Sequence, residues 1–228
     1  YLQWASEDGK CIDLKTNVIT PPPCDGTISL KQLMADGSTQ PLEPIIDALS
    51  VRNFDRRSVS GHDQFFATFS RFQTAALGRF GDMVAEARQR AGRQNMLYLE
   101  LMISLGMLDV IGLAASSGRL DAPFGERIDH AKVDEIVSQV ITQFDAIEAR
   151  QQRLLGCNEQ RQASTVGCDV TVRFQAQVLR TFAPIEVYAQ TLLAVKLIQA
   201  DARVVALNFV APEDHRIALR DYHQHMQF

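Results

Sequence analysis

Apolar and polar residues alternate along two stretches in the second half of the chain, residues 97–104 and 169–179. A third stretch, residues 204–210, is an apolar run with one polar residue, Asn208. Alternation with a period of two is typical of a strand that buries one face. We therefore predict three strands, with Glu100, Arg173, Gln175, Gln177 and Asn208 on the face opposite the apolar one.

Apolar residues recur at helical spacing between and after these strands, in residues 105–115, 131–155, 183–200 and 215–228, and residues 116–129 are predicted as a loop. Helices of this length suit crossovers between parallel strands, so the order of elements predicts an α/β protein with a parallel sheet. Parallel sheets are normally covered on both faces. The polar face therefore favours a closed barrel with a polar interior over an open sheet, and Glu100 and Arg173 are candidates to pair inside it.

Shorter elements are predicted before the first strand: a helix end in residues 1–9, a hairpin in 12–23, two short helices in 27–49 with a break at residues 36 and 37, and longer helices from residue 61 and in 80–92. We predict residues 1–92 as a mostly helical elaboration that includes a lid region, and residues 93–228 as part of a larger barrel domain. A complete (β/α)8 barrel has eight strands in about 250 residues. Three strands in 228 residues therefore predict a partial barrel.

Four phenylalanines share one face of the predicted helix that begins near residue 61, namely Phe65, Phe66, Phe69 and Phe72. Such a row of rings usually packs into a core. The alternative is an aromatic lid over an apolar pocket, because a large exposed apolar patch marks a binding surface. The spacing alone leaves both interpretations open.

The four cysteines form two local pairs, Cys11 with Cys24 and Cys157 with Cys168. Neither pair has zinc-knuckle spacing, and the segments between them are polar, so we predict two short disulfide-closed loops. Each bridge would contribute about 3 kcal/mol in the chain-entropy model. Disulfides favour an oxidising compartment, and we expect a periplasmic or secreted protein. The alternative is four buried thiols in a cytosolic protein.

The formal charge of −4 and the mixed surface charges give no reason to expect a nucleic-acid or membrane partner. No apolar run approaches the roughly 20 residues that span a bilayer. His223 and His225 resemble an HxH metal motif, but residues two apart on a helix point about 200° away from each other. We therefore predict no metal ligands within this chain.

Several stretches, taken in order, resemble the adenosine deaminase family, and most closely its secreted, growth-factor-like branch. They are YLQWASEDG, GHDQFFATFSRF, YLELM, VVALNFVAPED and RDYHQHM. The resemblance implies a TIM barrel that converts adenosine and water to inosine and ammonia through a zinc-activated water. It places the three predicted strands as the second to fourth strands of that barrel.

The zinc ligands and catalytic residues of the family fall outside the resembling segments. Two HxH ligands precede the segment that matches YLQW, and an HAGE motif follows the one that matches RDYHQHM. The resemblance therefore implies the first half of the barrel without its first strand. It also implies that zinc belongs to the intact enzyme, and that this chain alone holds no catalytic residue and is inactive.

The resemblance also assigns substrate-binding residues. Phe65, Phe66 and Phe69 match the apolar helix that closes over the nucleoside. Asn208, Ala211 and Glu213 fall at the purine-facing end of the fourth strand, where the family usually has aspartate for Asn208 and a purine-contacting glycine for Ala211. The expected partner is adenosine or a related 6-aminopurine nucleoside, and this branch often forms homodimers. The alternative function is a non-catalytic nucleoside-binding or signalling protein on the same scaffold.

Overall fold

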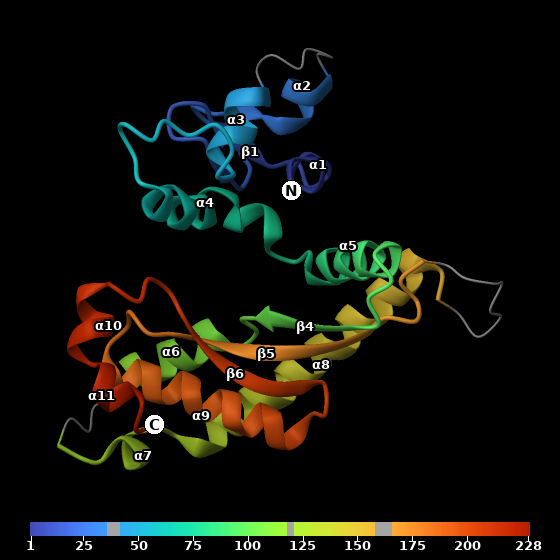
Figure 1. The fold of residues 1–228 in the computed structure, drawn as a ribbon. Helices are drawn as coiled ribbons and strands as arrows, with labels where there is room; N and C mark the ends of the chain where they lie inside the picture. The colour runs from blue at the N-terminus through green and yellow to red at the C-terminus, as the bar shows by residue number, and fades with distance from the viewer. Residues whose placement is uncertain (36–41, 118–120, 158–165) are drawn as a thin grey trace. The chain divides into compact units, whose positions relative to one another are not determined.

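A computed structural model describes residues 1–35, 42–117, 121–157 and 166–228. The chain divides into two compact units, Tyr1–Met83 and Val84–Phe228. This division falls within helix α5 (Phe80–Arg93), slightly before the predicted boundary between residues 92 and 93. Figure 1 shows both units and the labels used below.

The first unit combines a small antiparallel sheet with short helices. Its sheet has the order β2-β1-β3, and β1 pairs with β2 as the predicted hairpin. The elements are α1 (Leu2–Glu7), β1 (Cys11–Asp13), β2 (Val18–Thr20), β3 (Ile28–Ser29), α2 (Leu30–Ala35), α3 (Leu42–Ala48) and α4 (Gly61–Ala76). The predicted break between the two short helices, at residues 36 and 37, lies outside the described residues.

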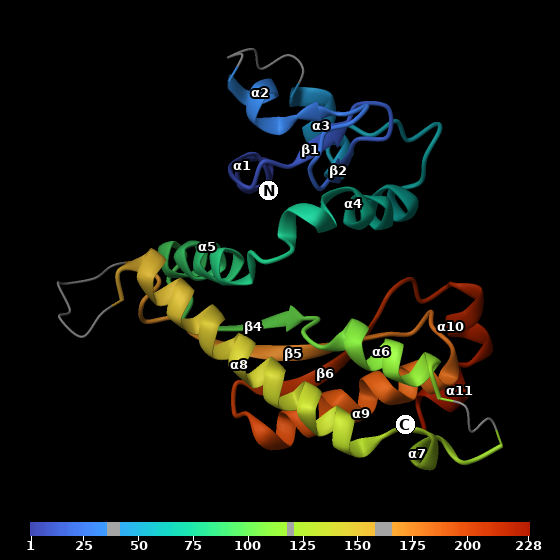
Figure 2. The same cartoon turned by 180° about the vertical axis from the view of Figure 1, so that it is seen from behind.

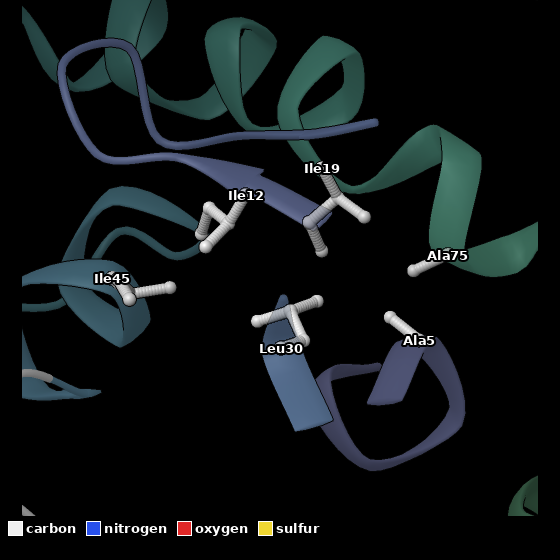
Figure 3. Packing of buried hydrophobic residues seen from close by; sticks show 6 residues of the cluster. All are labelled: Ala5, Ile12, Ile19, Leu30, Ile45 and Ala75. Atoms are coloured by element: carbon white, nitrogen blue, oxygen red, sulfur yellow. The ribbon is translucent and has the colours of Figure 1, made fainter. Parts of the chain in front are cut away.

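Each of six elements contributes one buried side chain to the core of the first unit. The side chains point toward a common centre in Figure 3 and are Ala5, Ile12, Ile19, Leu30, Ile45 and Ala75. A core made of so few residues is small, so the Cys11–Cys24 disulfide beside it is an important constraint on this unit.

The second unit contains a parallel sheet in the order β4-β5-β6, as predicted. Its strands are β4 (Tyr98–Ile103), β5 (Thr171–Leu179) and β6 (Val204–Val210). Its helices, apart from α5, are α6 (Met107–Ala115), α7 (Phe124–Arg127), α8 (His130–Leu155), α9 (Pro184–Ala200), α10 (Arg216–Arg220) and α11 (Tyr222–His225). The unit is therefore mixed α/β with a three-stranded parallel sheet.

Helices α6, α8 and α9 lie along one side of this sheet (Figures 1 and 2). Helix α9 packs against β5 and β6, and α6 packs against α9. Phe144 of α8 contacts Phe174 of β5, with ring centroids 4.9 Å apart. Phe174, Ala176 and Val178 are buried, so the apolar face predicted from alternation is the one that faces the helices.

Two predictions after the strands are wrong in detail. Residues 116–129, predicted as a loop, contain α7, whose Phe124 ring packs 5.7 Å from Tyr188 and 5.4 Å from Phe228. The single helix predicted over residues 215–228 is two short helices, because Asp221 leaves the helical conformation at the end of α10. Its carboxylate binds the neighbouring guanidinium of Arg220.

Both predicted disulfides are present. The Cα atoms are 5.4 Å apart in Cys11–Cys24 and 5.6 Å apart in Cys157–Cys168, within the usual range for a disulfide. The alternative of four buried thiols is therefore wrong. Among the described residues, no helix is both long and apolar enough to cross a membrane.

Candidate functional site

The face of the parallel sheet that points away from α9 carries polar side chains from all three strands. Pairing aligns Glu100 with Arg173, and Gln177 with Asn208. Tyr98 and Met102, on the same face, remain 48% and 54% exposed. A parallel sheet normally has helices on both faces. This exposed polar face is therefore the first candidate site of the second unit.

Glu100 is the centre of a hydrogen-bond network near the beginning of the strands. Its carboxylate accepts bonds from Gln175 Nε2 at 2.7 Å and from the Tyr98 hydroxyl at 2.8 Å. These two donors hold the pKa of Glu100 below its usual value, the Gln175 bond having the larger effect. The bond to Glu100 raises the pKa of Tyr98. Glu100 is therefore an ionised acceptor and unsuited to donate a proton near neutral pH.

The suggested pair between Glu100 and Arg173 is not formed. The two residues are opposite each other in the strand register, but the Arg173 guanidinium folds back and donates to the Val172 carbonyl at 3.0 Å. Glu100 reaches its two neutral partners instead. The strand positions therefore correctly predicted that Glu100 and Arg173 are neighbours, but the predicted pair between their side chains is wrong.

Closer to the carboxyl ends of the strands, a polar row crosses the sheet through Ser104, Gln177 and Asn208. The Ser104 hydroxyl donates to Gln177 Oε1, and Gln177 is the register partner of Asn208. Asn208 Nδ2 lies 3.1 Å from the sulfur of Met102. This row places amide groups where ligands bind in parallel α/β proteins, at the carboxyl ends of the strands.

The turn after β6 carries the two other predicted residues at this end, Ala211 and Glu213. Arg180, which follows β5, donates to the carbonyls of Phe209 and Val210 and lies 3.7 Å from the Glu213 carboxylate. Arg180 therefore joins the ends of the two strands. Glu213 itself remains exposed, so its carboxylate is accessible to a ligand.

Ala211 has a φ of 84°, a backbone conformation that disfavours residues with a Cβ atom. The other non-glycine residues with positive φ in the described ranges are asparagines, which tolerate this conformation. Ala211 is therefore the unusual case. Asn208 and Ala211 lie at the same end of β6, so the strained residue is next to the polar row.

In the first unit, four rings of α4 and the rings of Tyr1 and Trp4 form a continuous aromatic row. Neighbouring ring centroids along the row lie between 4.6 and 5.7 Å apart, in the order Phe66, Phe65, Phe69, Phe72, Tyr1 and Trp4. Phe65 and Phe69 are 47% and 46% exposed. The buried positions of α4 are Gln64, Thr68 and Ala75. The rings of Phe65 and Phe69 therefore lie outside the core.

The histidines of the described chain are dispersed. His62 contacts Asp63, His130 contacts the Gly125 carbonyl, and His215 caps α10 through Ile217. His225 is buried while its neighbour His223 is exposed. Within the described ranges, no group of three or more His, Cys, Asp or Glu side chains is arranged to hold a metal ion. These residues do not fit a zinc centre.

The resemblance proposed Asn208, Ala211 and Glu213 as substrate-binding residues, and no role was assigned to Gln177 or Arg180. The alternation had already placed Gln177 on the polar face with Arg173 and Gln175, so its position could have been identified. Arg180 lies beyond the last alternating residue, and its role in joining β5 to β6 depends on tertiary structure. A scan of protein-family models and searches of characterised proteins and of solved structures found no match to this chain.

Proposed function

We propose that this chain is part of a zinc-dependent adenosine deaminase-like aminohydrolase with a (β/α)8 barrel. In this proposal β4, β5 and β6 are the second to fourth barrel strands, and their polar face lines the barrel interior. The parallel order, the single apolar face and the polar row at the carboxyl ends support it. The proposed reaction, in which adenosine and water give inosine and ammonia, is that of the family that these segments resemble.

The observation that carries the proposal is the backbone of Ala211. The deaminase family usually has a glycine at the corresponding position, where it contacts the purine ring. Ala211 adopts a positive φ, which is the conformation that a glycine accepts without strain. Retention of this conformation despite a Cβ atom supports the match between the turn and the purine-binding turn of the family.

The residues of this chain would bind and orient the nucleoside. We assign the purine ring to the end of β6, with the Asn208 amide and the backbone of Ala211 as its contacts and Glu213 as a nearby acceptor. Phe65, Phe66 and Phe69 would supply apolar contacts as a lid. Since the described residues do not fit zinc, we assign no step of the reaction to the metal here, and its ligands would come from other segments of the whole enzyme.

The test is calorimetric titration of the 228-residue chain with adenosine and with inosine. We expect N208A to weaken adenosine binding by about 1 kcal/mol, or roughly fivefold, because one hydrogen bond is lost. Q143A is the matched control, since Gln143 is exposed on α8. Equal adenosine affinities for N208A, Q143A and the unmodified chain would contradict the assignment of Asn208.

A211G tests whether the turn at Ala211 favours glycine, independently of any contact with the purine ring. Removing the Cβ atom at a φ of 84° should stabilise the second unit by about 1 kcal/mol. The matched control is A146G, in the exposed interior of α8, which should destabilise by about 1 kcal/mol. Urea denaturation measures both, and destabilisation by A211G would show that the turn does not favour glycine.

Metal analysis and an inosine assay test whether the zinc ligands and catalytic residues lie outside these 228 residues. The proposal expects neither stoichiometric zinc nor turnover from these 228 residues, and finding both would contradict it. The coding sequence on either side distinguishes an enzyme from a binding or signalling protein. An upstream HxH and a downstream HAGE would favour the enzyme.

We also propose a periplasmic or secreted location and a homodimeric state for the whole protein. The two disulfides support the location, because such bridges persist in oxidising compartments. The dimer rests on the resemblance alone. Sedimentation equilibrium tests it, and a monomer at concentrations of about 100 μM would contradict it.

A further inference from the structure

A polar cavity lies at the amino end of the parallel sheet, opposite the proposed nucleoside contacts. It has a volume of about 330 Å³, room for roughly ten water molecules. Its walls come from the beginning of β5, from α8, from Arg88 of α5, and from the residues that precede β5 and β6. The proposed nucleoside contacts lie at the carboxyl ends of the same strands, so this cavity is a separate site and does not depend on the proposed function.

The strand register explains why the cavity exists. β5 begins at Thr171, but its pairing with β6 begins only at Phe174. The first residues of β5 therefore have β4 on one side and no strand on the other. Phe144 and Ile147 of α8 form an apolar wall, and three arginines, Arg88, Arg173 and Arg203, contribute to the lining.

Arg203 is already neutralised. Its guanidinium binds Asp201 at 2.6 Å, Asp145 at 2.8 Å and Glu148 at 3.2 Å. It also lies 5.4 Å from the centre of the Phe144 ring. These partners occupy its donors and compensate its charge. Arg203 therefore shapes the cavity but has little capacity to bind a further anion.

Arg88 is held differently. Its three nitrogens donate to neutral oxygens, the carbonyls of Gly167 and Cys168 and the side chain of Gln151, at 2.8 to 3.1 Å. Within the described ranges no carboxylate lies within ion-pair distance of it, and burial lowers its pKa while the more distant charges of Glu148 and Asp169 act in the opposite direction. A desolvated guanidinium without a counter-ion is a favourable partner for an anion.

Arg173 adds a second cation without an ion pair in the described part of the chain. Only its Nη1 atom is engaged, with the Val172 carbonyl at 3.0 Å, which leaves other N–H donors available. The opposing charges in the lining are Glu148, which pairs with Arg203, and Asp169, an exposed carboxylate. Within the lining, three arginines therefore face two carboxylates, those of Glu148 and Asp169. The other two acidic partners of Arg203, Asp145 and Asp201, are outside the lining.

We propose that this cavity binds a phosphate-class oxyanion between Arg88 and Arg173. A tetrahedral oxyanion can accept several N–H bonds at once and would replace the missing counter-charge. Its source is either free inorganic phosphate or a phosphate group carried by a larger molecule. Cys157–Cys168 closes the loop that contributes Cys168 to the wall, so the site belongs to the oxidised protein.

Titration calorimetry of the full 228-residue chain tests the proposal, with inorganic phosphate against sodium chloride of equal ionic strength. We expect saturable one-to-one binding of phosphate and none of chloride. A parallel titration with glycerol 3-phosphate distinguishes the sources. Tighter binding of the monoester identifies a carried phosphate group, and tighter binding of phosphate identifies the free anion. The absence of saturable binding in both titrations would overturn the site.

Two substitutions with opposite expected effects make the test specific. R173Q should weaken phosphate binding roughly tenfold, because charge-assisted bonds are lost. D169N should strengthen it roughly threefold by removing an opposing charge, which a folding defect would not do. R90Q is the control, because Arg90 is exposed on the same helix as Arg88 and pairs with Glu86. Equal weakening by R90Q and R173Q, or weaker binding by D169N, would overturn the proposal.

Discussion

Helices α4 and α8 both carry apolar residues at helical spacing, but they use these residues in opposite ways. In α8 the repeating residues face inward, and Val133, Val140 and Phe144 are almost completely buried. In α4 the inward positions include Gln64 and Thr68, while Phe65 and Phe69 are about half exposed. The spacing therefore identifies which residues share a face, and the rest of the chain determines which face is buried.

The polar inward face of α4 has a specific partner. Gln64 Nε2 donates to the Ser50 carbonyl at 2.7 Å, and Arg71 donates to the Ala48 carbonyl at 2.7 Å, both at the end of α3. Ala48 is the last residue of α3, so its carbonyl has no partner within the helix, and Ser50 follows two residues later. Helix α4 thus satisfies the end of α3 with polar side chains and carries its aromatic rings elsewhere. In α8 the inward face meets an apolar sheet, so rings are buried there.

Of the substitutions that test this comparison, F144A should have the largest effect on stability. Phe144 is 1% exposed and packs between the Phe174 ring and the Arg203 guanidinium, so its removal leaves a cavity. We expect a loss of about 3–5 kcal/mol in the unfolding free energy of the second unit. Hydrogen exchange of the α8 amides measures it. A loss below about 1 kcal/mol would mean that α8, like α4, does not rely on its ring.

Removing either disulfide should have the next largest effect, about 3 kcal/mol in the unit that contains it. Cys11–Cys24 closes the hairpin region beside α4, and Cys157–Cys168 closes the loop after α8. Serine pairs at each bridge allow the comparison. Trp4, the only tryptophan, reports unfolding of the first unit, and α8 amide exchange reports the second. Free thiols in the denatured, unreduced chain would contradict both bridges.

Local pattern was sufficient for the strands, the long helices and both disulfides. Alternation in β5 and the cap at Gly156 depend on residues adjacent in the sequence, so they could be predicted from it. Gly156 has a φ of 68°, as expected after a helix end. Helix α7 and the break at Asp221 depend on distant partners or on one side-chain interaction, and the pattern did not show them.

The candidate site was less predictable for the same reason. The polar face of the sheet and Asn208 followed from alternation, but the partner of Glu100 did not, because register fixes Cα neighbours and leaves side-chain choice open. The exposure of Phe65 likewise could not be predicted, because the buried neighbour Gln64 donates to carbonyls at the end of α3 and just beyond it. The partial barrel stays a prediction, since three parallel strands are compatible with both open and closed sheets.

A smaller effect is expected from Q64A, which tests why α4 turns a polar residue inward. Gln64 is 6% exposed, and its removal leaves the Ser50 carbonyl without its donor. We expect a loss of about 1–2 kcal/mol in the first unit, read from Trp4 fluorescence during urea unfolding. Q73A, at an exposed position of the same helix, is the control. Equal effects of the two substitutions would show that the buried amide has no special role.

The smallest expected effect on stability is that of F69A, below about 1 kcal/mol in the first unit. The Phe69 ring is 46% exposed and contacts other rings of the row rather than the core, so little apolar surface returns to water. The same Trp4 fluorescence measurement gives this value. Adenosine affinity, measured by calorimetry, should fall severalfold if the row is a lid.

Stability and adenosine affinity together distinguish a core role of the aromatic row from a lid role. F144A gives the reference value for a ring that belongs to a core. A ring that serves a core costs about 3–5 kcal/mol in stability when it is removed. A ring that serves a ligand costs little stability, because its partner is absent from the free protein. F69A and F144A both remove a phenylalanine ring, but F69A should reduce stability much less. A loss near that of F144A would mean that α4 buries its rings, as α8 does, and would remove the basis for the lid.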